Sequence, residues 1–215
     1  MSFPLSDLYD FILPFVPVVD TPLVDNALIR AVRVVACQTG IHRGVVTDNT
    51  VIGQNDYTLT PPTGYEIDSI LQVRLYPASD SSGKGVKLYP ISDSVLNDML
   101  TFDAALPTSW RYIAGGAFSL YPTPDSVEEF KVTAILRPEL DTALELDQVY
   151  YQYRELIADG AMAFLFAMPA KPWTNEKQSA QSYARFGQGV LALRARIRAG
   201  GQVNNGTLKS VRFGA

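Results

Sequence analysis

The only histidine, His42, is the first residue to weigh as a catalytic group, because imidazole titrates near neutral pH. It stands in the segment Thr39-Gly40-Ile41-His42-Arg43-Gly44, between a helical pattern and a series of strand-like runs. A catalytic triad built on His42 would need a nucleophile motif such as Gly-x-Ser-x-Gly, and none accompanies it. We therefore predict no catalytic role for His42.

Carboxylates gather in two places that could in principle hold a metal ion or act as an acid and base pair. Asp141, Glu145 and Asp147 lie in the acidic segment 139–147, and Glu128 and Glu129 precede an apolar run. We interpret the first group as a solvated linker, and the second has no matching acidic partner in the sequence, as sugar hydrolysis would require. The sequence therefore predicts no metal site, no cofactor and no enzymatic activity.

Two glycine-containing segments share only fragments of nucleotide-binding motifs. Gly83-Lys84-Gly85 lacks the spacing and the following Ser or Thr of a phosphate-binding loop, and Gly115-Gly116 lacks the dinucleotide-binding pattern. We predict a surface turn at the first and a hairpin turn at the second. The single cysteine, Cys37, allows no internal disulfide, and its apolar run predicts a core position.

The composition is that of a folded protein with a hydrophobic core. Hydrophobic residues make up 47% and charged residues 19% of 215 residues, which suits one large domain or a domain with a second one inserted. No apolar stretch reaches the ~20 residues of a membrane helix. The N-terminus carries no positive side chain before its apolar residues, so we expect no signal peptide.

Charge is divided unevenly along the chain. Residues 171–215 hold eight Lys or Arg and one Glu, a balance of 8 − 1 = +7, so residues 1–170 carry −4 − 7 = −11. A basic end on an acidic body favours contact with an acidic neighbour or between copies of the chain. Arg194 and Arg198, four residues apart, share one helix face and are candidates for this contact, with DNA as the other partner left open.

The strongest helical pattern is a hairpin over residues 150–198. Its two runs meet at a corner where prolines stop the first helix, and Thr174 or Asn175 can cap the second. The residues expected to fix this corner are Met168, Pro169, Lys171, Pro172 and Trp173. On the second run, the expected packing side is Ala180, Tyr183, Ala184, Gly187, Val190, Leu191, Arg194 and Ile197.

The rest of the chain predicts an α+β fold. A short helix capped by Ser6 and a helix from Pro22 to Thr39 come first. Short strand-like runs follow, including 50–59, 65–76, 87–90, 107–113, 117–122 and 129–137, with a short helix over 92–102. We expect an antiparallel helical bundle (1–41 and 139–199) with an inserted, small β-sandwich-like domain (42–138).

The last segment, 200–215, reads as an extended C-terminal arm rich in Gly and Asn. Its second half has the composition of a β-strand, and such an arm is suited to pairing with the sheet edge of a partner. We expect Leu208, Val211 and Phe213 to be apolar anchors, and Lys209 and Arg212 to be their electrostatic partners, on a neighbouring protein.

Several segments together resemble a known family. The run from Ala158 to Asn175 resembles the signature of tailed-phage head-to-tail adaptor proteins of the tail tubular protein A type, although Asn175 stands where that pattern has an acidic residue. Residues 110–112, 120–124 and 136–140 are similar to further parts of it.

The resemblance implies a structural protein of the virion neck that assembles in the host cytoplasm. Its relatives form a ring, usually of twelve copies, between the portal protein and the tail or nozzle protein, and genomic DNA passes through the ring without sequence-specific binding. It also implies that the C-terminal arm grips the portal or a neighbouring subunit. The sequence alone leaves three alternatives: another neck or tail-completion or terminator protein, a cell-wall-sugar hydrolase, and a DNA-binding regulator.

Overall fold

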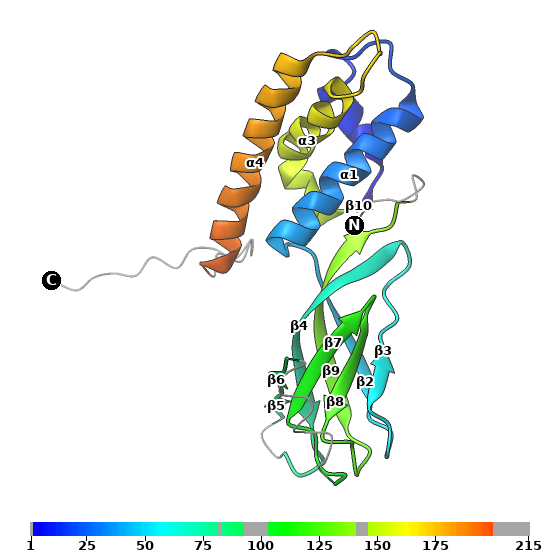
Figure 1. Cartoon of the computed structure of the whole chain (residues 1–215), viewed down its shortest axis with the longest axis vertical. Coiled ribbons are helices and arrows are strands. Elements are labelled where there is room, and N and C mark those ends of the chain that lie inside the picture. The colour runs from blue at the N-terminus through cyan, green and yellow to red at the C-terminus, as the bar shows by residue number, and fades with distance from the viewer. Residues whose placement is uncertain (1, 81–82, 93–102, 141–145, 200–215) are drawn as a thin grey trace, which may run out of the picture.

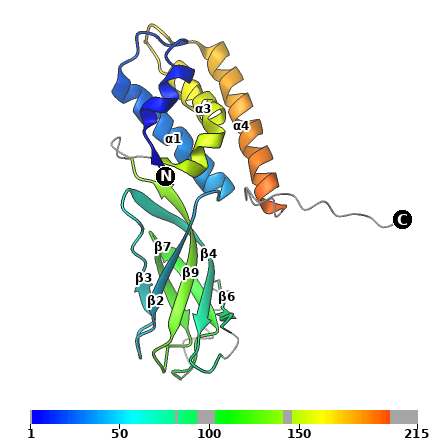
Figure 2. The same ribbon diagram turned by 180° about the vertical axis from the view of Figure 1, so that it is seen from behind.

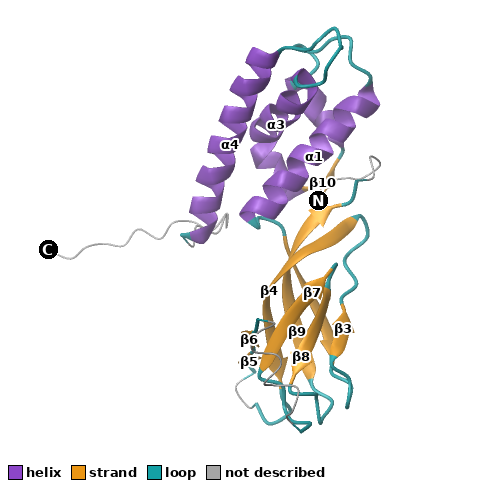
Figure 3. Ribbon diagram, in the orientation of Figure 1, coloured by secondary structure: helices purple, strands orange, loops and turns teal. Residues whose placement is uncertain are grey.

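The computed structural model describes residues 2–80, 83–92, 103–140 and 146–199. The chain forms an elongated α+β protein with helices at one end and two sheets at the other (Figures 1 and 2). We call these the helical region and the β region; Figure 3 shows the helices at one end and the two four-stranded sheets at the other. Residues 93–102 of the predicted helix over 92–102, the linker carboxylates Asp141 and Glu145, and the arm 200–215 lie outside the described residues.

The helical region contains three α-helices and two 3-10 helices among its described residues. They are η1 (Leu5–Phe11), α1 (Thr21–Thr39), η2 (Gln148–Tyr153), α3 (Arg154–Phe166) and α4 (Glu176–Arg198). The predicted second helix is confirmed, with Pro22 in its first turn and Gly40, at φ 63°, as its left-handed C-cap. The first helix is a 3-10 helix whose N-cap is Pro4, so the expected Ser6 cap is wrong.

The three α-helices pack around one hydrophobic core, and Gly160 lies where they come closest. A Cβ atom at this position would stand 2.7 Å from Phe186 Cε2 of α4 and 2.9 Å from Ala31 Cβ of α1. A hydrogen at Gly160 therefore lets both neighbours approach α3. The core also takes in Leu8 and Ile12 from the N-terminal segment, both fully buried. A two-stranded pairing of β1 (Ser2–Phe3) with β10 (Leu146–Asp147) fastens the N-terminus beside η2.

The β region contains two four-stranded sheets. One has the order β2 (Arg43–Asn49), β9 (Glu129–Pro138), β4 (Tyr65–Tyr76) and β5 (Val86–Lys87). The other has the order β3 (Asp56–Thr58), β8 (Ala117–Tyr121), β7 (Ser109–Ala114) and β6 (Tyr89–Pro90). All described pairs are antiparallel except β6 with β7. The strand predictions over 65–76, 117–122 and 129–137 are confirmed, whereas only Asp56–Thr58 of the run 50–59 is a strand.

Aromatic rings from both sheets meet in a second core, separate from that of the helices. Phe130 of β9 lies 5.3 Å from the ring of Tyr57 and 5.6 Å from that of Phe118, in edge-to-face geometry. All three side chains are buried. The turn between β7 and β8 is made by Gly115 and Gly116, both at positive φ, which confirms the predicted hairpin.

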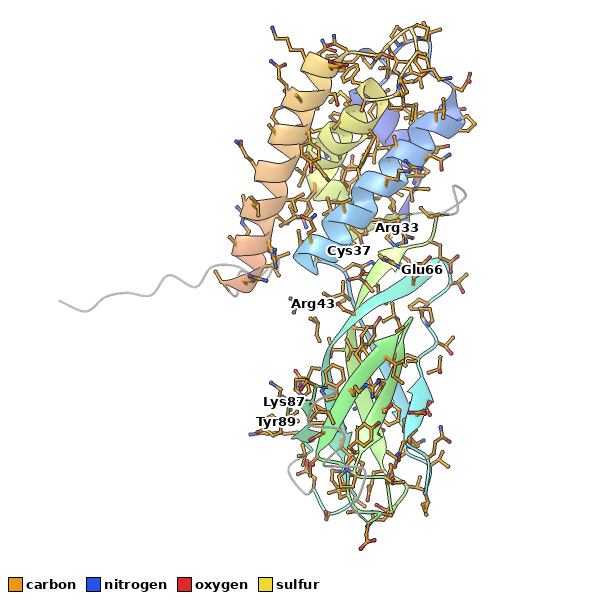
Figure 4. All side chains as sticks on the ribbon, viewed as in Figure 1. Arg33, Cys37, Arg43, Glu66, Lys87 and Tyr89 are labelled. Carbon is orange, nitrogen blue, oxygen red and sulfur yellow. The ribbon has the colours of Figure 1, made fainter. Side chains whose placement is uncertain are left out.

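Charged side chains join the two regions. Arg33 of α1 contacts Glu66 of β4 at 3.2 Å, and Arg137 of β9 contacts Glu66 at 2.9 Å and Asp68 at 3.3 Å. The thiol of Cys37 donates a hydrogen bond to Asp68 at 3.0 Å. Figure 4 shows Arg33, Cys37 and Glu66 gathered at this junction. Burial and the bond to Asp68 raise the pKa of Cys37 to about 11, so the half-buried thiol is a structural group and not a nucleophile.

The Glu66 carboxylate should make the junction sensitive to acid. Burial alone would raise the pKa of Glu66, but hydrogen bonds from Arg33 and Arg137, and their charges, outweigh it, and the pKa lies below its ordinary value of 4.5. A lowered pKa in the folded protein adds stability above pH 4.5 that is lost as the pH falls through the folded pKa. Because 39% of the Glu66 side chain is exposed, we expect an effect on the order of 1 kcal/mol or less.

Urea unfolding between pH 7 and pH 3 would measure this contribution. The parent protein should lose more stability on acidification than Glu66→Gln, which keeps the shape of the side chain and cannot titrate. Identical acid profiles for the two proteins would contradict the proposed contribution of Glu66.

Candidate assembly interface

The outward face of α4 differs from the sequence prediction. The residues of α4 that are buried against the rest of the helical region are Ser182, Phe186, Val190 and Leu193. Of the expected packing side, only Val190 is buried, whereas Tyr183 is 66% and Leu191 63% exposed. The prediction was wrong because α4 carries two apolar stripes, and the ring of Phe186 fits against Gly160, which draws the other stripe inward.

The uncovered stripe forms a continuous apolar surface, which we call the outer face of α4: Ala180, Tyr183, Ala184, Gly187 and Leu191. These positions follow the spacing i, i+3, i+4, i+7 and i+11, so they lie on one side of the helix. A cavity of about 450 Å³ adjoins the face, lined by Ala180 and Tyr183 of α4 and by Ala163 and Phe164 of α3, among others. Most of this surface is apolar and open to solvent, which is typical of a protein contact surface.

The predicted hairpin corner is present and is closed by hydrogen bonds. The Thr174 hydroxyl donates to the Met168 carbonyl at 2.5 Å and accepts from the Lys171 amide at 3.0 Å. The Asn175 side chain caps α4 by accepting from the Gln178 amide at 3.1 Å. Trp173 packs, half-buried, against the helical core, and Lys171 lies 6.0 Å above its ring. These contacts fix the angle between α3 and α4, and thus the direction of the outer face.

The structure brings Arg194 and Arg198 to the junction end of α4. Both line a cavity of about 260 Å³, together with Arg43 from the start of β2 and the apolar side chains of Leu71 and Ile135. None of the described residues lining it is a carboxylate. Three guanidinium groups around one opening favour an acidic partner group. Along α4, the apolar outer face near the corner therefore gives way to a basic end near the junction.

The residues considered for catalysis or metal binding do not form a catalytic or metal site among the described residues. The ring of His42 lies edge-on to Tyr65 at 4.6 Å and to Tyr150 at 5.7 Å, at the junction between the two regions. Across the described ranges, no group of three or more His, Cys, Asp or Glu side chains is placed to hold a metal ion. In the same part of the chain, no helix is both long and apolar enough to cross a membrane. The arm residues Leu208, Lys209, Val211, Arg212 and Phe213 lie outside the described residues.

Sequence reasoning missed two exposed apolar residues in the helical region. Phe15 is 60% and Val18 69% exposed, in the segment between η1 and α1. This segment has no helical period, and the prolines at 14, 17 and 22 keep it irregular, so periodicity gives no signal for a buried or an exposed side. The connection turns Val16 and Val19 into the helical core, and this leaves Phe15 and Val18 facing outward.

In the part of the chain that the structure describes, α4 exposes one apolar face, which is typical of a protein contact surface. The sequence matches the family model of the SU10 adaptor protein over residues 10–208. The chain therefore belongs to the SU10 adaptor protein family, and this membership supports the role of a phage structural adaptor. A search of curated proteins finds no match.

Proposed function

We propose that the protein is a head-to-tail adaptor of a phage virion, of the tail tubular protein A type. Copies form a ring of twelve beneath the portal protein, and the ring carries the tail or nozzle protein. The observation that carries this proposal is the match to the SU10 adaptor family over residues 10–208, which spans both the helical and the β region. The chain assembles in the host cytoplasm and acts at the head-to-tail junction as a structural protein, without catalysis.

Each part of the chain has a role in this proposal. The helical region is an antiparallel bundle (1–41 and 139–199) that packs side by side with its neighbours. The β region is a sandwich-like inserted domain (42–138) that meets the tail, and its separate aromatic core supports this division. The acidic body of the chain suits a channel through which genomic DNA slides without sequence-specific binding, since it repels phosphate.

The arm 200–215 binds the portal protein or a neighbouring subunit. Leu208, Val211 and Phe213 supply apolar anchors, with Lys209 and Arg212 as cationic partners, and Arg194 and Arg198 extend the basic surface onto the end of α4. The hairpin corner, at Met168, Pro169, Lys171, Pro172 and Trp173, holds α4 in the direction that this requires.

Deletion of residues 201–215 tests this role. We expect the truncated protein to keep the circular dichroism spectrum and unfolding midpoint of the full chain, because the described residues already form two hydrophobic cores. It should no longer bind purified portal protein in a co-sedimentation assay. A matched full-length variant, Leu208→Ser with Val211→Ser and Phe213→Ser, should lose binding likewise, whereas Ser210→Ala should retain it. Portal binding by the truncated protein would refute the role of the arm.

A further inference from the structure

We infer that the outer face of α4 binds a second copy of this chain through the segment around Phe15 and Val18. The contact is heterologous: one surface of each copy meets a different surface of the next. This contact would join neighbouring subunits of the ring. That it closes into a ring rests on the proposed function. Two exposed apolar surfaces, their equal level in the molecule and their charges support this contact.

Each of the two surfaces is formed by large apolar side chains that are exposed in the helical region. Tyr183 and Leu191 project from α4, and Phe15 and Val18 project from the segment between η1 and α1. They lie on different sides of α4, because Phe15 lines a cavity with Gln178, Gln181 and Arg185, whereas Tyr183 lines the cavity on the opposite flank. One chain cannot bring the two surfaces together. A second copy can.

The two surfaces lie at the same level along the molecule. Phe15 stands beside Gln178 and Gln181, and Tyr183 is less than one turn of α4 further along. A neighbour placed beside the first copy therefore meets the outer face without sliding along the long axis. A heterologous contact that repeats by rotation alone closes into a ring, whereas one that includes translation continues as a filament.

The charges follow the same order on both surfaces. On α4, the apolar residues near the corner give way to Arg194 and Arg198 toward the junction. On the other surface, Phe15 follows η1, which carries exposed Asp7 and Asp10 and begins next to β1 at the junction end of the helical region (Figure 1). Aligned side by side, apolar residues face apolar residues and carboxylates face arginines. This match also gives the contact a single orientation.

Cross-linking between engineered cysteines tests the contact. In a Cys37→Ser background, Val18→Cys and Tyr183→Cys are introduced into one full-length chain, and a short bis-maleimide is added to the concentrated protein and to assembled particles. We expect the double variant to give a ladder of covalent oligomers. Each single variant should remain monomeric, and a mixture of the two single variants should stop at dimers, because each copy then offers only one reactive partner.

Leu191→Asp, added to the double variant, should abolish the ladder, since the charge would be buried only in the contact and stays exposed in the isolated chain. Val127→Asp, which adds the same charge at an equally exposed apolar position of the β region (63%, as for Leu191), should leave it intact. Dimers of the Tyr183→Cys single variant would show that two outer faces meet each other, and would overturn the inference. So would the absence of any ladder in both the concentrated protein and the particles.

The result separates this inference from the proposed function. Particles that hold the protein between portal and tail without the cross-linked ladder would refute the contact and leave the adaptor role standing. A ladder from the free protein, together with particles in which the protein lies elsewhere, would support the contact and refute the role.

Discussion

Phe130→Ala is expected to lower the free energy of unfolding of the β region by about 3–5 kcal/mol, the usual cost of removing a fully buried aromatic ring. Phe130 stands in β9, between β2 and β4, and its ring meets those of Tyr57 and Phe118 from the second sheet. The alanine would leave a cavity at the point where the two sheets meet. The sheets cannot move together to fill that cavity without breaking hydrogen bonds between their strands.

The chain carries one tryptophan in each region, so fluorescence can follow the two regions separately. Trp110 is buried in the β region and Trp173 lies at the helical corner. In Phe130→Ala, the Trp110 signal (isolated with Trp173→Phe) should shift to lower urea, while the helical circular dichroism signal shifts less. Tyr89→Ala, at an exposed aromatic of β6, should change stability by no more than about 0.5 kcal/mol. An equal shift of both signals would show that the two regions unfold as one unit.

Gly160→Ala should destabilise the helical region by about 2 kcal/mol, even though alanine is the better helix former. The new Cβ would meet Phe186 Cε2 at 2.7 Å and Ala31 Cβ at 2.9 Å, so α3 must move away from α1 or α4. Forcing an extra methyl group into a packed interior costs typically about 1–3 kcal/mol. The Cβ of Ala31 is fixed to its helix backbone and cannot rotate aside, so the cost should not fall at the lower end of that range.

A second glycine in a helix of the same region provides the matched control. Among the described residues beyond its own helix turn, no heavy atom lies within 4 Å of a Cβ built at Gly187 in α4, so Gly187→Ala should stabilise the helix by up to about 1 kcal/mol. Urea unfolding followed by circular dichroism would measure both variants. If the two substitutions changed stability in the same direction, the close approach at Gly160 would not be the determining feature.

The helices could be predicted from the sequence because local signals and tertiary contacts agree there. Pro22 and Gly40 mark the ends of α1, and the prolines of the corner separate α3 from α4. Residues 148–153 are an exception. They continue the helical pattern in sequence but form the 3-10 helix η2, next to the short pairing of β1 with β10.

The strands were harder to predict where one side of the strand is open. β2 contains only Val45 and Val46 as apolar residues, in adjacent positions, so alternation gives no signal, and the strand is held by pairing with β9 along its whole length. β1 and β10 have two residues each and cannot be detected by any period. These strands form because of pairing with residues far away in the sequence, and such pairing leaves no pattern in the local sequence.

Only part of the candidate interface could be predicted, again because long-range contacts decide the rest. The corner and the arginines of α4 follow from prolines and charge, but the choice between the two apolar stripes of α4 depends on where Phe186 finds space. That space is created by Gly160, 26 residues earlier in the sequence and on another helix. The apolar stripe that the helical period predicts is present, but its residues Tyr183 and Leu191 face outward.

The connection between the two regions also has a mechanical meaning. α1 leads into β2, and β9 leads back toward the helices, and these two strands lie next to each other, with Arg43 opposite Ile135. A pull on the far end of the β region would act along both strands, perpendicular to the hydrogen bonds between them. Because both strands would be loaded in the same direction, they would not slide past each other. Bending is resisted at the junction, by the ion pairs of Arg33 and Arg137 with Glu66 and by the packing of His42 against Tyr65 and Tyr150. The β region should therefore behave as a rod that is stiff under tension and bends, when it bends, at the junction.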